Sequence, residues 1–116
     1  MTSLSRLHRA TRIRLLNDSF RADPETVAAT EGFLPLFGQM SIPFFLEKVR
    51  AYADFTPGDP YAEHECGALE VAGQDVHWRI DYVAPDLAAP SSDPADPAKT
   101  RRVLRFILGE ELAQAA

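Results

Sequence analysis

The sequence has little cysteine and no long apolar run, and each of these two absences excludes certain classes of protein. Its 116 residues include a single cysteine, Cys66. No internal disulfide can therefore form, and no CxxC pair is present to hold zinc. No apolar stretch approaches the roughly 20 residues that cross a membrane as a helix. Arginines interrupt residues 1–16, so the continuous apolar core of a signal peptide is missing. A cytoplasmic protein is the expectation.

The composition suits one soluble domain over residues 1–116, but its charges are segregated. Hydrophobic residues make up 46% and charged residues 25%, with a formal net charge of −5. Residues 1–21 carry five arginines against Asp18, whereas residues 54–96 carry ten acidic residues against Arg79 alone. Two interpretations stay open: solvated faces that attract one another within the fold, or an acidic surface that docks on a basic partner.

Apolar residues at helical spacing predict three helices. The first spans about 11–21, with residues 1–8 frayed or bent because Leu7 lies off the apolar face. The second spans about 42–54, after a start at Ser41 and Pro43. The third spans about 97–113, with Asp96 as the N-cap and Pro97 in the first turn. Its apolar stripe consists of Thr100, Val103, Leu104, Ile107 and Leu108.

Two segments predict β-structure. The stretch "GFLPLFG" at 32–38 is short, apolar and bounded by glycines, which favours a strand; Pro35 would place it at a sheet edge. Alternation over 68–72 and 76–82 predicts a hairpin that turns Trp78 inward.

The register of this hairpin depends on its turn. A turn at Gly73-Gln74 pairs Val71 with Val76 and Leu69 with Trp78. A turn at Ala72-Gly73 would oppose Glu70 and Asp75, which repel, so the first register is preferred.

The order helix, strand, helix, hairpin, helix predicts an α+β fold. We expect a small, mainly antiparallel sheet of about three strands with helices packed on one face and the other face partly open. Residues 84–97 are proline-rich and should form a surface loop.

The stretch "DPYAEHECGALE" at 59–70 concentrates the candidate chemistry. Glu63 and Glu65 share one side of an extended chain while His64 points the other way, so neither a metal nor another cofactor is expected. An acid–base interpretation would join these three with Asp81 in a small hydrolase or metal-assisted enzyme, with Arg79 stabilising an anion. The structural interpretation has three parts, and it makes Cys66 a small buried apolar residue. In the others, His64 caps the strand entry by bonding the backbone or Asp59, and Tyr61 packs on the hairpin.

Two further groups of charged residues have competing interpretations. Glu70, His77, Arg79 and Asp81 form either a functional polar strip or an ordinary solvated sheet face with cross-strand ion pairs. A joint basic patch would support nucleic-acid binding, although the acidic pI of 5.1 and the lack of a phosphate-cradling glycine loop argue against direct binding. That patch would consist of Arg12, Arg14, Arg101, Arg102 and Arg105.

Four segments carry a family resemblance: "IRLLNDSFR" (13–21), "FTPGDPYAEHECGALEV" (55–71), "WRIDY" (78–82) and "DPADPAKTRRVL" (93–104). They resemble a family of short bacterial proteins, the domain-of-unknown-function family numbered 3768. Glu65 stands where that family usually has aspartate and Cys66 where it usually has an aromatic residue, which argues against a cysteine nucleophile. Residues 22–40 match least. The resemblance implies no particular activity, cofactor or catalytic residue, and it suggests an accessory product of a bacterial, phage or plasmid genome.

The sequence thus predicts a non-enzymatic interaction module. Its acidic surface over 54–96, with the exposed sheet face, would bind a protein partner, for example as a phage- or plasmid-type inhibitor of a nucleic-acid-handling complex. The small hydrolase and the nucleic-acid binder are the alternatives. The expected partner-binding residues are Asp59, Tyr61, Glu63, His64, Glu65, Arg79 and Asp81.

Overall fold

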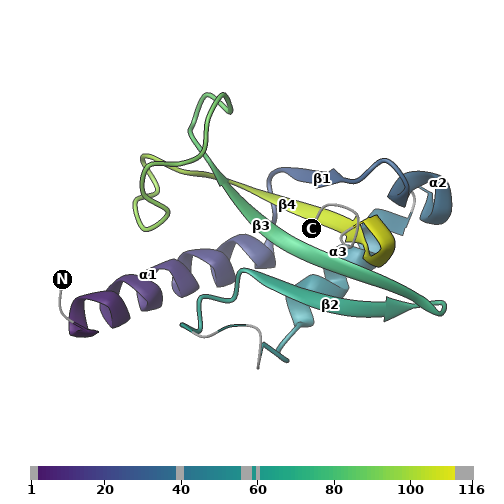
Figure 1. The fold of residues 1–116 in the computed structure, drawn as a ribbon, viewed down its shortest axis with the longest axis horizontal. Helices are drawn as coiled ribbons and strands as arrows, with labels where there is room; N and C mark the ends of the chain where they lie inside the picture. The colour runs from purple at the N-terminus through teal and green to yellow at the C-terminus, as the bar shows by residue number, and fades with distance from the viewer. Residues whose placement is uncertain (1–2, 39–40, 56–58, 60, 112–116) are drawn as a thin grey trace.

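The computed structural model describes residues 3–38, 41–55, 59 and 61–111, with side chains from His8 onward (Figure 1). Four helical and strand segments come first: α1 (Ser3–Ala22), β1 (Val27–Ala29), α2 (Phe33–Phe37) and α3 (Ile42–Ala51). Three strands follow: β2 (Cys66–Val71), β3 (Gln74–Val83) and β4 (Arg101–Leu108). No helix among these residues is long and apolar enough to span a membrane.

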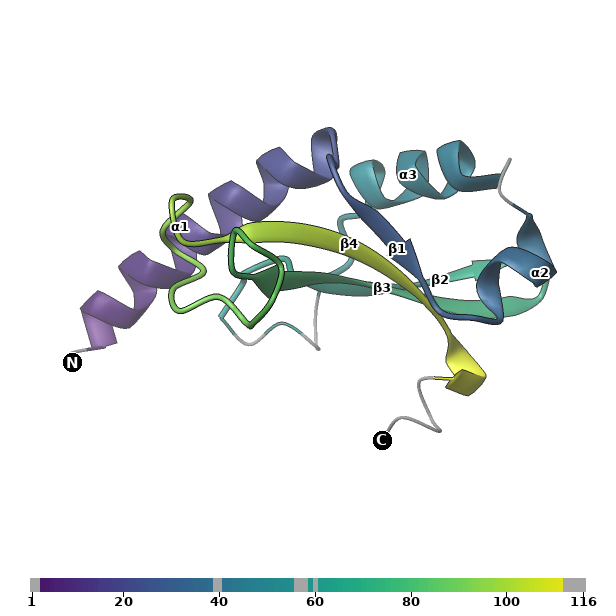
Figure 2. The same cartoon turned by 90° about the horizontal axis from the view of Figure 1, so that it is seen from above.

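The four strands form one mixed sheet in the order β1-β4-β3-β2. β1 runs parallel to β4, and the other two pairings are antiparallel. Helices α1 and α3 lie on the same side of this sheet (Figure 2). The predicted α+β class, with a mainly antiparallel sheet and helices on one face, is confirmed. We call the face away from α1 and α3 the open face.

The core lies between the sheet and the helices. Trp78 is fully buried, as predicted, and Phe106 beside it on β4 stacks on Phe33 with ring centroids 5.3 Å apart. Phe45 and Val49 of α3 are also fully buried. Burial of large aromatic side chains dominates the free energy of a core this size.

Two predictions near the N-terminus are wrong. Residues 3–8 are helical rather than frayed, because the segment holds leucine and arginine and lacks glycine and proline. The stretch 32–38 contains the short helix α2 instead of a strand, since Pro35 lies in its first turn, where no N–H is needed. The strand lies earlier, at Val27–Ala29, and pairs with β4. The helix predicted from residue 42 is confirmed as α3.

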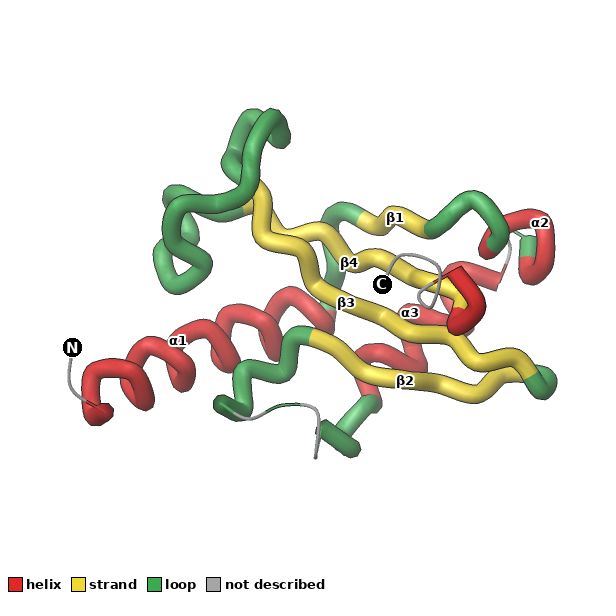
Figure 3. The backbone as a smooth tube through the Cα atoms, viewed as in Figure 1, coloured by secondary structure: helices red, strands yellow, loops and turns green. Residues whose placement is uncertain are grey.

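The predicted last helix, 97–113, is also wrong. Residues 101–108 form β4, an inner strand between β1 and β3 (Figure 3), with buried residues on both faces. In the sequence, a strand that is buried on both faces appears as a continuous apolar run. Periodicity alone does not distinguish such a run from a buried helix. Asp96 caps a turn instead, because its Oδ1 accepts a hydrogen bond from the Ala98 N–H at 2.9 Å.

The hairpin is confirmed, but the preferred register is wrong. The turn is Ala72-Gly73, with φ of 53° and 76°, as a two-residue primed turn requires. Glu70 therefore opposes Asp75, and Gly67 rather than Leu69 opposes Trp78. A side chain on Gly67 would come within 2.7 Å of Trp78 Nε1, so the fit around the tryptophan sets the register. The Glu70–Asp75 repulsion is weak because both side chains are exposed and screened.

Candidate functional site

Asp59 and residues 61–65, which we call the lead-in loop, lead into β2, and the Asp59 carboxylate fixes the backbone of this loop. Asp59 accepts hydrogen bonds from the backbone N–H groups of Glu63 at 2.8 Å and His64 at 3.0 Å. Ala62 and His64 both adopt positive φ, 55° and 59°. Non-glycine residues hold such geometry only where the surroundings impose it. The expected link between His64 and Asp59 thus exists, but through the histidine backbone.

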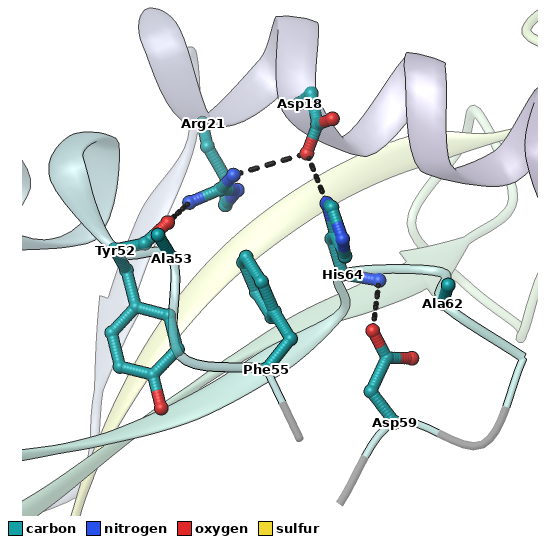
Figure 4. A pocket seen from close by; sticks show the side chains of 8 residues that line it. All are labelled: Asp18, Arg21, Tyr52, Ala53, Phe55, Asp59, Ala62 and His64. Atoms are coloured by element: carbon teal, nitrogen blue, oxygen red, sulfur yellow. Dashed lines mark hydrogen bonds and ion pairs between the residues drawn. The ribbon is translucent and has the colours of Figure 1, made fainter. Parts of the chain in front are cut away.

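The His64 ring is held against α1 by three residues, which with His64 we call the Asp18 clasp (Figure 4). Asp18 Oδ1 lies 2.8 Å from His64 Nδ1 and 3.0 Å from Arg21 Nη2. Phe55 lies between His64 and Arg21, stacked on the His64 ring with centroids 3.9 Å apart and with its ring 4.9 Å from the Arg21 guanidinium carbon. Burial raises the pKa of Asp18, but the hydrogen bonds from His64 and Arg21 outweigh it and the net pKa is lowered.

The clasp borders a pocket of about 410 Å³. Tyr52, Ala53, Asp59 and Ala62 complete its lining. An imidazole that donates Nδ1–H to a carboxylate has its tautomer fixed, which makes Nε2 a proton acceptor. Arg21 bonds more than Asp18. It also donates hydrogen bonds to the carbonyls of Val49 at 2.7 Å and Tyr52 at 3.2 Å, at the C-terminal end of α3.

A buried polar network centred on Asn17 connects the lead-in loop to the sheet. Asn17 is fully buried and donates to the Glu63 carbonyl at 2.9 Å and the Tyr82 hydroxyl at 2.8 Å. The Tyr82 hydroxyl donates in turn to Glu65 Oε2 at 3.0 Å. Arg102 Nε donates to Asn17 Oδ1 at 2.7 Å. Burial raises the pKa of Tyr82 and lowers that of Arg102. The network joins α1, the lead-in loop, β3 and β4.

Three carboxylates of the lead-in loop, Asp59, Glu63 and Glu65, form what we call the acidic corner. In the described part of the chain none of them forms a salt bridge, whereas Asp18, Asp81 and Asp93 each pair with an arginine. Burial raises the pKa of Glu63, the charges of Glu65 and Asp59 raise it further, and the charge of Arg9 offsets part of this rise. The acidic corner is therefore a region of net negative charge that Arg9 compensates only in part.

The structure does not assemble the residues predicted for an enzyme. His64 bonds Asp18, Glu65 bonds Tyr82, and Asp81 lies on the open face between Arg79 and Arg105. Among the described residues no group of three or more histidine, cysteine, aspartate or glutamate side chains could hold a metal ion.

Two of the expected structural roles are not seen. Tyr61 is 57% exposed, more than packing on the hairpin would allow. Cys66 is exposed, so its predicted burial is wrong. Cys66 is exposed because it lies on the open face of β2, which is an edge strand, and α1 and α3 pack on the other face of the sheet.

The arginines proposed for a joint basic patch are spread over two faces. Arg102 is buried beside Asn17, on the side of the helices. Arg105 lies on the open face, and Arg101 contacts Thr26 at 3.4 Å. Neighbouring residues on a strand point to opposite faces, so these three cannot form one surface.

The sequence did not predict a role in this site for five residues: Asn17, Asp18, Arg21, Tyr82 and Arg102. A signal was present for two of them, because Ile13, Asn17 and Arg21 recur every four residues on one face of α1. Polar residues in line with a buried apolar position are expected to have buried partners. No sequence signal told which partners those would be.

The fold and site define a small α+β protein whose loop is clasped to a helix beside an acidic corner. A model of the family described as "Protein of unknown function (DUF3768)" matches residues 29–111, and the chain belongs to that family. The resemblance drawn from the sequence is thereby confirmed, although segment 13–21 lies outside the match. No curated protein and no solved structure matches the chain.

Proposed function

We propose that the protein is a non-enzymatic interaction module that binds a basic partner protein through the acidic corner. One observation supports this: Asp59, Glu63 and Glu65 lie on one short loop without a salt bridge in the described part of the chain, and burial together with the charges of Glu65 and Asp59 raises the pKa of Glu63 despite the opposing charge of Arg9. Like charges gathered in this way cost stability in the free protein. A basic partner would relieve that cost and gain electrostatic complementarity.

The loop is well prepared for such a partner. Asp59 fixes the loop backbone, and Asn17 holds the Glu63 carbonyl at 2.9 Å. The Glu63 side chain itself makes no hydrogen bond to a described residue. A loop whose backbone is already fixed loses little backbone conformational entropy on binding, which favours affinity.

A more specific form of the proposal concerns the kind of partner. Carboxylates on a fixed loop can occupy a basic groove that otherwise takes the phosphates of nucleic acid. We therefore propose a nucleic-acid-handling protein as the partner, inhibited as a phage- or plasmid-type accessory protein would inhibit it. A DNA oligonucleotide should then displace the partner competitively, and lack of competition would contradict this form while leaving the general proposal standing.

The experiment compares three baits in affinity capture from the source cells, quantified by mass spectrometry. Glu63→Lys reverses a charge whose side chain is not needed for any described hydrogen bond. Glu31→Lys is the control for the same change of charge, since Glu31 is an exposed glutamate that lies outside the lead-in loop. A basic protein should be retained by the wild type and by Glu31→Lys, and lost with Glu63→Lys. Equal capture by all three baits would overturn the proposal.

A second candidate function rests on the Asp18–His64 pair. Its 2.8 Å contact and the adjacent pocket are the geometry of a general base whose imidazole is oriented by a carboxylate. As an enzyme, the protein would hydrolyse small esters at neutral pH with water as the nucleophile. Hydrolysis that is lost in His64→Gln and kept in Glu63→Gln would support this candidate, and no turnover by the wild type would remove it.

A further inference from the structure

Two arginines lie directly opposite each other on the open face. Arg79 of β3 and Arg105 of β4 are register partners, so their side chains are nearest neighbours on the same face. Like charges placed opposite each other in an antiparallel pair destabilise a sheet. This pairing therefore needs a compensating negative charge.

Asp81 supplies one such charge, and only one. Its Oδ1 accepts a hydrogen bond from Arg79 Nε at 2.6 Å, and its Oδ2 accepts one from Arg105 Nε at 2.8 Å. The Asp81 side chain is 23% exposed, while the two arginine side chains are 49% and 35% exposed. The Arg79–Asp81–Arg105 cluster thus carries a net charge of +1 within reach of solvent.

Each guanidinium group uses only its Nε in these contacts. Arginine often binds a carboxylate with two parallel hydrogen bonds, but here the Nη groups of Arg79 and Arg105 donate to no described residue. The register partners that surround the cluster are small or apolar: Cys66 beside Arg79, Val103 beside Asp81, and Ala28 beside Arg105. The remaining donors therefore have neither a partner nor a neutralising acid at these adjacent positions.

We propose that the Arg79–Asp81–Arg105 cluster binds a phosphate group. A tetrahedral phosphate dianion has enough oxygens to accept hydrogen bonds from both guanidinium groups at once, and planar guanidinium forks match this geometry. Asp81 holds both Nε atoms in place, so the arginines are ordered before the anion arrives. The cluster shares no residue with the acidic corner, and this proposal does not rest on the interaction with a basic partner.

The test is an NMR titration at low ionic strength that follows the backbone amides and the arginine Nε–H signals. Inorganic phosphate and O-phosphoserine are the two probes. Saturable shifts should centre on Arg79 and Arg105. Arg79→Gln should weaken binding by about tenfold or more, which is the loss of at least one charge-assisted hydrogen bond. Arg105→Lys should weaken it similarly, because lysine keeps the charge but loses the fork.

Arg50→Gln is the matched control, because Arg50 is an exposed arginine that pairs with Glu47 on α3. It should change the affinity less than about twofold. If inorganic phosphate binds more tightly than phosphoserine, the site is assigned to the free ion. If phosphoserine binds more tightly, the site is assigned to a phosphate monoester. Either result supports the proposal. Unchanged affinity in both cluster variants, or shifts centred elsewhere, would overturn it. Because neither variant alters Glu63, the outcome is independent of the capture experiment.

Discussion

Arg102 Nε donates a hydrogen bond to Asn17 Oδ1 at 2.7 Å and so joins the inner strand β4 to helix α1. Replacing Asn17 by alanine removes this acceptor and two donors at a fully buried position. We expect Asn17→Ala to lower the free energy of unfolding by about 2–4 kcal/mol, because the buried Nε of the charged Arg102 guanidinium is left without its acceptor. Leu15→Ala, at an exposed position of the same helix, should change it by less than about 0.5 kcal/mol. Urea unfolding measures both, and equal losses would contradict the network.

Gly67→Ala tests the register of the hairpin. A Cβ at this position would lie 2.7 Å from Trp78 Nε1 and from the Tyr52 ring. We expect a loss of about 1–3 kcal/mol in the free energy of unfolding, since a close-packed core must shift to admit the methyl group. Ala68→Ser, one residue along on the open face, should be tolerated. A neutral Gly67→Ala would indicate that Leu69, not Gly67, opposes Trp78.

The Asp18 clasp should contribute stability that disappears in acid. The pKa of Asp18 is lowered in the folded protein because the bonds from His64 and Arg21 outweigh burial. A lowered pKa means that the contribution is complete above the unfolded value of 3.8 and is lost as the pH falls through the folded value. Between pH 7 and pH 3, we expect the free energy of unfolding of the wild type to fall by about 0.5–1 kcal/mol more than that of Asp18→Asn. This figure allows for solvent screening of a partly exposed carboxylate. Parallel pH profiles for the two proteins would contradict this role.

Cys66 should react slowly despite its exposure. Burial raises the pKa of its thiol, and the charges of Glu65 and Asp59 raise it further, so little thiolate is present at neutral pH. Alkylation by iodoacetamide at pH 7.5 should be several-fold slower than in the urea-unfolded chain. Glu65→Gln should accelerate it by removing one negative charge. A folded rate equal to the unfolded rate would argue against the negative potential of the acidic corner.

The hairpin and α3 could be predicted from sequence because their periodicity is local. Trp78 alternates with polar residues over one strand, and the apolar face of α3 recurs at helical spacing. β4 could not be predicted, since burial on both faces erases the alternation that marks a strand. The register also escaped prediction, because it follows from the contact of Gly67 with Trp78 and Tyr52 rather than from the turn sequence alone.

The candidate site was predicted only in part for a similar reason. Asp59, Glu63, His64 and Glu65 are adjacent in sequence, so their gathering on one loop was visible. Asp18 contributes to the same site from 46 residues away, and only the packing of α1 against the loop brings it to His64. Contacts of this kind depend on the whole fold, which local patterns do not encode.

The pKa of the Glu63 carboxyl, measured by NMR titration of its side-chain signals, tests the acidic corner most directly and needs no partner. We expect a pKa above the ordinary value of 4.5, because burial and the charges of Glu65 and Asp59 disfavour the ionised form more than Arg9 favours it. We also expect Glu65→Gln to lower this pKa. A pKa at or below 4.5 that does not respond to Glu65→Gln would show that these carboxylates do not form one negative surface.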